Sequence, residues 1–247
     1  MRVTVVGCAG SFPGPSSPSS CYLVEHDGFA LVLDLGNGAL GALQRYASLD
    51  DIDAVALSHL HADHCLDLCS FYVYRRYHPE GPRPRIPVYG PAGTADRMAR
   101  AYDLPAQPGM NGEFEFRSYD APLRIGPFTV TVARVRHPVE AYGLRVEADG
   151  RSLVYSGDTG PTPALVDLAR GVDVALFEAS LLDGMEMPDV HMTGRQAAEL
   201  AAQADVGTLV LTHLVPWHDT EVLERQAREA FTGDLRLAAS GMTIDLP

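Results

Sequence analysis

The sequence contains no lysine, so all 19 basic residues are arginine. Against 32 acidic residues they leave a formal net charge of −13 at pH 7. Long nucleic acids are bound by clustered cations that neutralise their phosphates. A nucleic-acid polymer is therefore not favoured as a partner, and a small anionic substrate is, although a local arginine patch would override the average.

Long apolar segments are also missing. A membrane-spanning helix needs about 20 consecutive apolar residues, and no run in this chain approaches that length. Residues 1–7 look like a strand that runs into a glycine turn, and they lack the apolar length and cleavage site of a secretory signal. The four cysteines show no zinc-ribbon spacing. We therefore expect a cytoplasmic protein with reduced thiols and no membrane partner.

The chain has room for a large core. Its 247 residues, 46% of them apolar, allow one large domain or two small ones. No repeat, charge block or low-complexity linker divides it, and the Pro/Ser-rich residues 13–20 read as a surface loop. We therefore predict a single domain over residues 1–247.

Hydrophobic periodicity places the secondary structure. Strands are predicted at 2–6, 22–25, 30–34, 54–57, 87–89, 113–118, 129–135, 143–147, 152–156, 172–177, 208–211 and 235–238. Helices are predicted at 38–48, 63–76, 94–102, 163–170, 193–203 and 220–231. Strands and helices alternate through both halves, so we expect an α/β fold with its sheets buried between helical layers.

Histidine is scarce, yet three of the nine histidines lie in His59-Leu60-His61-Ala62-Asp63-His64. The apolar residues 54–57 just before this motif predict a strand that ends at it. Extended backbone places side chains i and i+2 on the same side, so His59 and His61 can hold one metal ion. Asp63 and His64 follow as a helix begins, which turns them toward a second ion. The alternative is a chance histidine cluster on a solvated loop.

Four ligands are too few for two ions, and three further residues each follow a predicted strand. They are His137, Asp158 and His213. Loops gather into sites at strand ends. A lone histidine at a strand end is more often a hydrogen-bonded surface residue, but the pattern shared by all three favours ligation.

This set of residues, in this order, resembles the metallo-β-lactamase superfamily of dinuclear metal hydrolases over nearly the whole chain. The resemblance implies a four-layer αβ/βα sandwich, with two mixed sheets face to face and helices outside. It implies that the first ion is bound by His59, His61 and His137 and the second by Asp63, His64 and His213, with Asp158 bridging them. It also implies that Asp34 orients the first histidine cluster without touching metal.

Such a site has a defined chemistry. Imidazole and carboxylate ligands suit zinc, with manganese or iron as alternatives, because ligand type alone does not choose the metal. Two ions about 3.5–4 Å apart can share a bridging hydroxide and lower the pKa of that water from 15.7 toward about 7. The cofactors are therefore expected to be two divalent ions, and Asp63 is counted among the catalytic residues.

His191 indicates which bond is cut. It precedes Thr193, a good N-cap, and a histidine there can protonate a leaving alkoxide or bind a phosphate oxygen. A surface histidine in a capping loop is the alternative. His-x-Thr before an Ala-rich helix, with residues 177–180 upstream, resembles the phosphodiesterase branch, which contains ribonuclease Z-like transfer-RNA endonucleases and cyclic-nucleotide phosphodiesterases. Glu178 either supports His191 or is a plain strand-end carboxylate.

Two features favour a small substrate within that branch. Nothing resembles the long basic arm of the transfer-RNA enzymes, and Asp67-Leu68-Cys69 replaces their Gly-Leu-Pro-Gly run. The N-terminal glycine turn and residues 71–79 resemble the actinobacterial cyclic-AMP phosphodiesterases of the atypical class II kind. Arg75 or Arg76 would then meet a phosphate, and Tyr72 or Tyr74 would stack on a base. A helix packing its aromatic face into the core explains the tyrosines equally well.

The sequence therefore predicts a phosphodiesterase that cleaves cyclic nucleotides, with a small anionic phosphodiester as partner and a homodimer allowed. An RNA 3′-processing endonuclease is the second hypothesis. A non-catalytic metal-binding scaffold is the third, and it is disfavoured because all seven candidate ligands are present.

Overall fold

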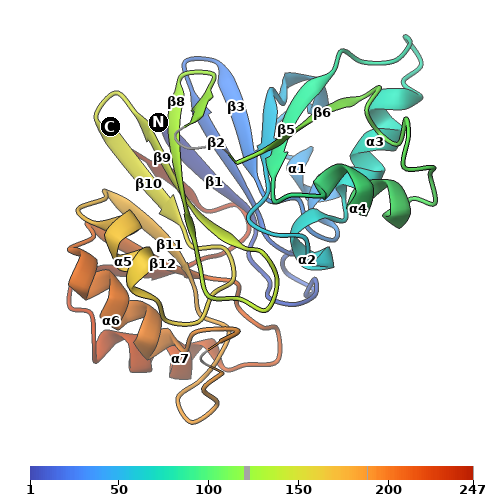
Figure 1. Cartoon of the computed structure of the whole chain (residues 1–247). Coiled ribbons are helices and arrows are strands. Elements are labelled where there is room, and N and C mark those ends of the chain that lie inside the picture. The colour runs from blue at the N-terminus through green and yellow to red at the C-terminus, as the bar shows by residue number, and fades with distance from the viewer. Residues whose placement is uncertain (120–122, 188, 247) are drawn as a thin grey trace.

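Two seven-stranded sheets lie face to face, with helices on their outer sides (Figure 1). The structure is a computed structural model that describes residues 1–119, 123–187 and 189–246. Five residues of the predicted domain 1–247 lie outside this described part. The predicted four-layer architecture is confirmed.

The first sheet has the strand order β14-β1-β2-β3-β4-β5-β6. Its strands are β1 (Arg2–Gly7), β2 (Cys21–His26), β3 (Phe29–Leu33), β4 (Ala54–Ala56), β5 (Ile86–Gly90), β6 (Phe114–Ser118) and β14 (Thr243–Asp245). Strands β1 to β3 pair antiparallel, whereas β3 to β6 pair parallel. Because β14 pairs with β1, the two ends of the chain lie side by side, as Figure 1 shows.

The second sheet has the order β13-β12-β11-β10-β9-β8-β7. Its strands are β7 (Leu123–Ile125), β8 (Phe128–Arg134), β9 (Tyr142–Ala148), β10 (Arg151–Tyr155), β11 (Val174–Glu178), β12 (Thr208–Thr212) and β13 (Asp234–Leu237). Strands β7 to β10 pair antiparallel and β10 to β13 parallel. Both sheets are therefore mixed.

Helices cover the outer face of each sheet. The helices on the first sheet are α1 (Ala39–Leu43), α2 (Ala62–Cys65), α3 (Leu68–Arg76) and α4 (Thr94–Ala101), and a short 3₁₀ turn, η1 (Leu49–Asp51), lies between α1 and β4. Those on the second are α5 (Pro163–Ala169), α6 (Gly194–Ala204) and α7 (Thr220–Arg228). None of these helices combines the length and the apolar character needed to cross a bilayer.

The continuous apolar runs of the inner strands follow from burial on both faces. In β3, Leu31 and Leu33 point into the layer between the sheets, whereas Val32 packs under the helices. In β10, Tyr155 points into the inter-sheet layer and Val154 points outward. A strand covered on one face only would alternate apolar with polar residues.

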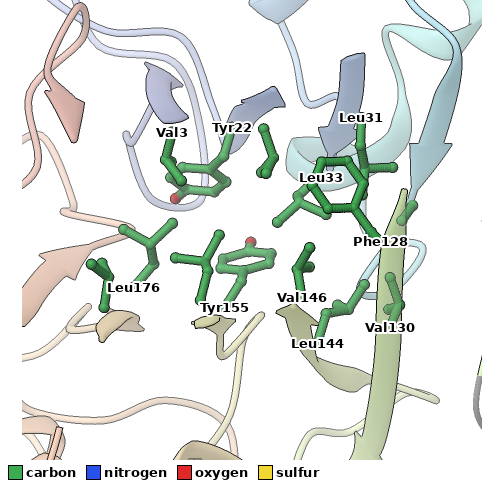
Figure 2. Packing of buried hydrophobic residues seen from close by; sticks show 14 of the residues in the cluster. Val3, Tyr22, Leu31, Leu33, Phe128, Val130, Leu144, Val146, Tyr155 and Leu176 are labelled. Atoms are coloured by element: carbon green, nitrogen blue, oxygen red, sulfur yellow. The ribbon is translucent and has the colours of Figure 1, made fainter. Parts of the chain in front are cut away.

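Figure 2 shows the layer between the sheets, where side chains of the two sheets meet. The Tyr22 and Tyr155 rings lie with their centroids 4.8 Å apart. Each hydroxyl is buried and has a partner, since Tyr22 Oη lies 2.6 Å from Thr212 Oγ1 and Tyr155 donates to Asp34 Oδ2 at 2.7 Å. Both phenols thus link the core to residues at the ends of strands.

The helix predicted over residues 63–76 is two helices, α2 and α3, which break at Leu66 and Asp67. The Asp67 carboxylate accepts from the Leu40 amide at 2.8 Å, and the Asp67 amide donates to the Leu35 carbonyl at 3.1 Å. These contacts satisfy polar groups of Asp67 outside its own helix, so the chain turns there. Periodicity alone does not reveal such long-range partners.

Candidate metal centre

Seven side chains converge where loops leave the carboxyl ends of strands in both sheets. They form two groups whose ligand atoms lie within 4.8 Å of one another in each group. The first group is His59, His61, His137 and Asp158, and the second is Asp63, His64, Asp158 and His213. The structure therefore brings all seven predicted ligands together, and Asp158 belongs to both groups.

The loop after β4 carries the first histidines. His61 is extended at φ −68° and ψ 154° and caps α2, which places Asp63 and His64 in the first turn of that helix. Figure 1 shows α2 below α1, on the side of the first sheet away from the chain termini. Gly36 allows this arrangement, because a Cβ there would lie 1.9 Å from the Asp63 carbonyl oxygen.

The other three ligands follow β8, β10 and β12. The His137 Nδ1 atom lies 3.0 Å from the Val190 carbonyl oxygen, which leaves Nε2 facing the first group. His213 has φ +54°, a left-handed conformation that is uncommon for a residue with a Cβ. Ser180 Oγ lies 2.8 Å from His213 Nδ1, so Nε2 faces the second group. Strain of this kind is often found at functional sites.

The nitrogen and oxygen atoms of the seven side chains face one another at distances expected around bound cations. His59 Nε2 and His137 Nε2 each lie 3.1 Å from His61 Nδ1, and His64 Nε2 lies 3.3 Å from His213 Nε2. Asp158 turns one oxygen to each group, with Oδ2 3.7 Å from His59 Nε2 and Oδ1 3.1 Å from His64 Nε2. The buried Oδ1 atom has no hydrogen-bond partner in the described residues. An orphaned buried carboxylate oxygen among imidazole nitrogens fits a divalent ion.

The electrostatics of the first ligand group agree with this fit. Burial lowers the pKa of His59, His61 and His137, which favours the neutral imidazole that a metal ligand requires. Burial would raise the pKa of Asp158, but charge interactions with His213, His64 and His59 outweigh it and hold the pKa well below its ordinary value. The bridging candidate is thus an ionised carboxylate.

Comparison with known proteins shows to which family this chain belongs. A family model described as a beta-lactamase superfamily domain matches residues 31–214. The chain belongs to the metallo-β-lactamase superfamily. An uncharacterised protein of Mycobacterium leprae is 44% identical to it over 258 residues, covering 100% of this chain and 89% of the relative. A ribonuclease Z of Mycobacterium bovis is 32% identical over 248 residues, covering 87% and 86%.

A solved structure agrees with the sequence relatives. The metallo-β-lactamase fold protein YhfI of Bacillus subtilis superposes with a TM-score of 0.89 at 27% identity, covering 98% of both chains. Together, these relatives and the two ligand groups show that the protein is a metal-dependent hydrolase of the superfamily.

Asp34 supports the ligands of this hydrolase without belonging to either group. Its carboxylate accepts from the Ser58 amide at 2.6 Å and from Tyr155 Oη at 2.7 Å, and it lies 2.7 Å from His64 Nδ1. Within the 59–64 motif Asp34 thus contacts His64 directly. It reaches His59 through Ser58, whose Oγ donates to Asp34 Oδ2 at 2.7 Å and lies 3.0 Å from His59 Nδ1. Contacts of this kind fix the tautomer and orientation of a metal-ligating histidine.

His191 lies beside both ligand groups of the hydrolase. Its ring centroid is 5.5 Å from that of His213 and 5.7 Å from that of His137. His191 Nδ1 lies 2.8 Å from Glu178 Oε1, and Glu178 is fully buried. Burial lowers the pKa of His191, but the Glu178 carboxylate outweighs it and raises the pKa to about 9. The structure therefore pairs the two residues and leaves Nε2 of His191 free of Glu178.

Three predicted substrate residues lie elsewhere. Arg75 is 2% exposed and donates to the Pro84 carbonyl, and Tyr72 is 5% exposed with its ring 5.2 Å from that of Tyr102. Arg76 Nη1 pairs with Glu113 Oε1 at 3.0 Å. Among the described residues, no hydrogen bond, ion pair or ring contact joins them to the ligand groups. Arg75 is buried, and Tyr72 packs inside the protein as the alternative for the tyrosines predicts.

Sequence reasoning missed Ser58, Ser180 and Tyr155, which hold the ligands in place. Ser58 adjoins His59 and Ser180 lies two residues after Glu178, so position in the motifs could have indicated both. Tyr155 carries no such signal, because its contact with Asp34 spans 121 residues of sequence.

Proposed function

We propose that this hydrolase cleaves the phosphodiester bond of a small cyclic nucleotide of the cyclic-AMP kind. The proposal is carried by His191, which is held by the buried Glu178 carboxylate beside both ligand groups. A two-ion hydrolase that expels an alkoxide benefits from a proton donor at this place. A held proton donor supports hydrolysis of a phosphodiester, whose alkoxide is a poor leaving group, over a reaction whose leaving group needs no proton.

The residues divide the work. Divalent ions, when bound by the two ligand groups, supply Lewis-acid charge and lower the pKa of water. Glu178 fixes Nδ1 of His191, so that Nε2 holds a proton facing the ligand groups. As a water oxygen joins phosphorus, one proton of that water passes to solvent. The ester P–O bond breaks, the departing oxygen takes the Nε2 proton, and His191 then regains a proton from solvent. Asp34, through His64, and Ser180, through His213, hold the ligands in one orientation.

Overall charge supports a small substrate. The net charge of −13 repels a long polyanion, whereas ions in the two groups confine positive charge to one spot. A mononucleotide places its whole charge at that spot. We propose zinc as the resident metal, with manganese or iron as alternatives.

RNA 3′-end processing is the second candidate, and the 32% identity to a ribonuclease Z favours it. It uses the same bond cleavage on a polymer. The scaffold alternative is disfavoured because the ligand groups and the His191–Glu178 pair are both complete.

One panel of substrates tests the proposal. Purified protein with zinc or manganese is assayed on 2′,3′- and 3′,5′-cyclic nucleotides, bis(4-nitrophenyl) phosphate and a precursor transfer RNA. We expect turnover of a cyclic nucleotide and of the aryl diester. Cleavage of the RNA alone would reverse the ranking, and no turnover of any diester would contradict both readings.

We further propose a single domain that acts in the cytoplasm, where its cysteines stay reduced. The pairing of β14 with β1 supports one domain, since both ends of the chain enter one sheet. All four cysteines are free, and three are buried. Gel filtration with light scattering tests whether the protein forms the homodimer that the sequence allows.

A further inference from the structure

The loop after β1 runs beside the chain that follows His213. The Leu214 amide donates to the Cys8 carbonyl at 2.8 Å, and the Gly10 amide donates to the Leu214 carbonyl at 3.0 Å. A Cβ on Gly10 would lie 2.5 Å from the His213 carbonyl oxygen, so a glycine is needed for this close approach. The next amide, Ser11 N, lies 3.3 Å from His213 Nε2. Residues 10–12 therefore border the second ligand group.

Two aromatic rings stand together at this border. Phe12 follows Ser11, Trp217 lies four residues after His213, and their ring centroids are 4.8 Å apart at an interplanar angle of 33°. Phe12 is 36% exposed and Trp217 is 70% exposed. Tryptophan is highly buried on average, so an exposure of 70% is unusual. Most of the Trp217 ring is open to solvent, four residues from the buried ligand His213.

We propose that Phe12 and Trp217 form a platform on which the nucleobase of the substrate stacks. This inference rests on the proposed function, because it places the base next to the phosphodiester that the ligand groups would hold. Successive Cα atoms are about 3.8 Å apart, so the platform begins one residue from the contact with His213. That separation is within the reach of one nucleotide.

The chemistry of the platform fits a base. Every nucleobase has a π face, and stacking on aromatic side chains is worth about 1–3 kcal/mol per base, which corresponds to about 5- to 150-fold in affinity. The rings carry no charge, so they attract the uncharged part of the nucleotide and leave its phosphate to the ligand groups. Two adjacent rings offer area for a single base, which agrees with a mononucleotide.

Trp217 is the only tryptophan of the chain, so its fluorescence reports on the platform directly. The metal-loaded protein is titrated with AMP and, separately, with ribose 5-phosphate, which carries the phosphate without the base. We expect AMP to quench the emission with saturation and ribose 5-phosphate to leave it unchanged. Equal responses to the two ligands, or no response to AMP, would overturn the proposal.

Variants of Phe12 provide the matched control. Phe12→Ala is expected to weaken AMP binding and raise the KM for the cyclic nucleotide about 10- to 100-fold, with kcat within about 3-fold. Phe12→Tyr keeps the ring and should retain the affinity, and Trp217→Phe should keep KM while removing the signal. Unchanged AMP affinity and KM in both Phe12→Ala and Trp217→Ala would overturn the platform.

The two experiments separate this inference from the proposed function. If no cyclic nucleotide is hydrolysed, a base-dependent quenching by AMP still supports the platform, because binding is measured without turnover. If cyclic nucleotides are hydrolysed but neither the emission nor KM depends on the two rings, the proposed function stands and the platform is wrong.

Discussion

At the scale of single residues, Asp158 has the most demanding environment. It is 2% exposed, and its two oxygens face different groups of imidazoles. Removing one partner from a buried charged network leaves the others uncompensated. A buried carboxylate shared by both ligand groups is suited to binding cations, so removing its charge should weaken metal binding in both groups.

Asp158→Asn keeps the shape of the side chain and removes its charge. We expect metal content to fall from two ions per chain to one or none, and kcat/KM on bis(4-nitrophenyl) phosphate to fall by at least about 100-fold. Mass spectrometry of the bound metals and steady-state kinetics check this. Asp167→Asn, on the surface of α5, is the control and should change neither quantity. Full turnover by Asp158→Asn would contradict the bridging role.

His191→Ala tests the proton donor. General acid catalysis contributes about 10²- to 10⁴-fold, and it matters most for a poor leaving group. We expect kcat for a cyclic nucleotide, which expels an alkoxide, to fall at least about 100-fold. The loss for bis(4-nitrophenyl) phosphate, which expels a stable phenolate, should be smaller. Equal losses on both substrates would assign His191 to positioning instead.

The residue types of the site were predictable, and so were two of their supports, Asp34 and Glu178, but the remaining supports were not. Histidines and aspartates at strand ends are visible in the sequence, and His191 was found from the cap that follows it. Ser180 and Tyr155 depend on contacts between distant segments, so only the fold brings them to the ligands. Arg75 looked available in the sequence because periodicity does not show that the Pro84 carbonyl occupies its guanidinium.

At the scale of elements, most strands and helices lie where the periodicity predicts them, including the three-residue β4, whereas two short strands were missed. The strands β7 and β14 have three residues each, too few for an alternation to appear. The helix predicted at 38–48 is the five-residue α1, and that at 63–76 is interrupted at Asp67. At Asp67, contacts with other segments, rather than local propensity, decided the boundary.

Gly36→Ala tests how closely the loop after β3 approaches α2. The added Cβ would meet backbone at 1.9 Å, so α2 must move and carry Asp63 and His64 with it. We expect a loss of about 1–3 kcal/mol of unfolding free energy and weaker binding of the second ion. Thermal melts and metal titrations measure both.

Gly41→Ala is the matched control for that variant. Gly41 lies in α1, and a Cβ there meets nothing within 4 Å. Alanine favours a helix over glycine by about 0.5–1 kcal/mol, so stability should be unchanged or slightly higher. The close-approach argument fails if both variants behave alike.

At the scale of the whole molecule, the ligand groups join the two sheets. His59, His61, Asp63 and His64 follow β4 of the first sheet, whereas His137, Asp158 and His213 follow strands of the second. Ions bound to both sets would cross-link the sheets at one end. Binding to the folded state alone stabilises a protein by mass action.

Removal of metal by a chelator should therefore lower Tm. An ion present at 100 times its Kd contributes about 2.7 kcal/mol, which for a chain of this size corresponds to about 5–10 °C. Added zinc or manganese should restore the original Tm in scanning calorimetry. Phe128→Ala, a change in the inter-sheet core, should lower Tm both with and without metal. A Tm that is unchanged by the chelator would contradict the proposal that bound ions cross-link the two sheets.

The phenol of Tyr155 belongs at once to the inter-sheet core and to the support of Asp34 (Figure 2). The support formed by Tyr155 and Asp34, the floor of the metal centre, therefore cannot be redesigned without repacking the interior of the protein. Substrate preference is open to change at the rim, where residues 11–14 and 216–218 are exposed or half-buried and adjoin the segments that contact His213. A library aimed at new specificities should vary those two segments and leave the floor as it is.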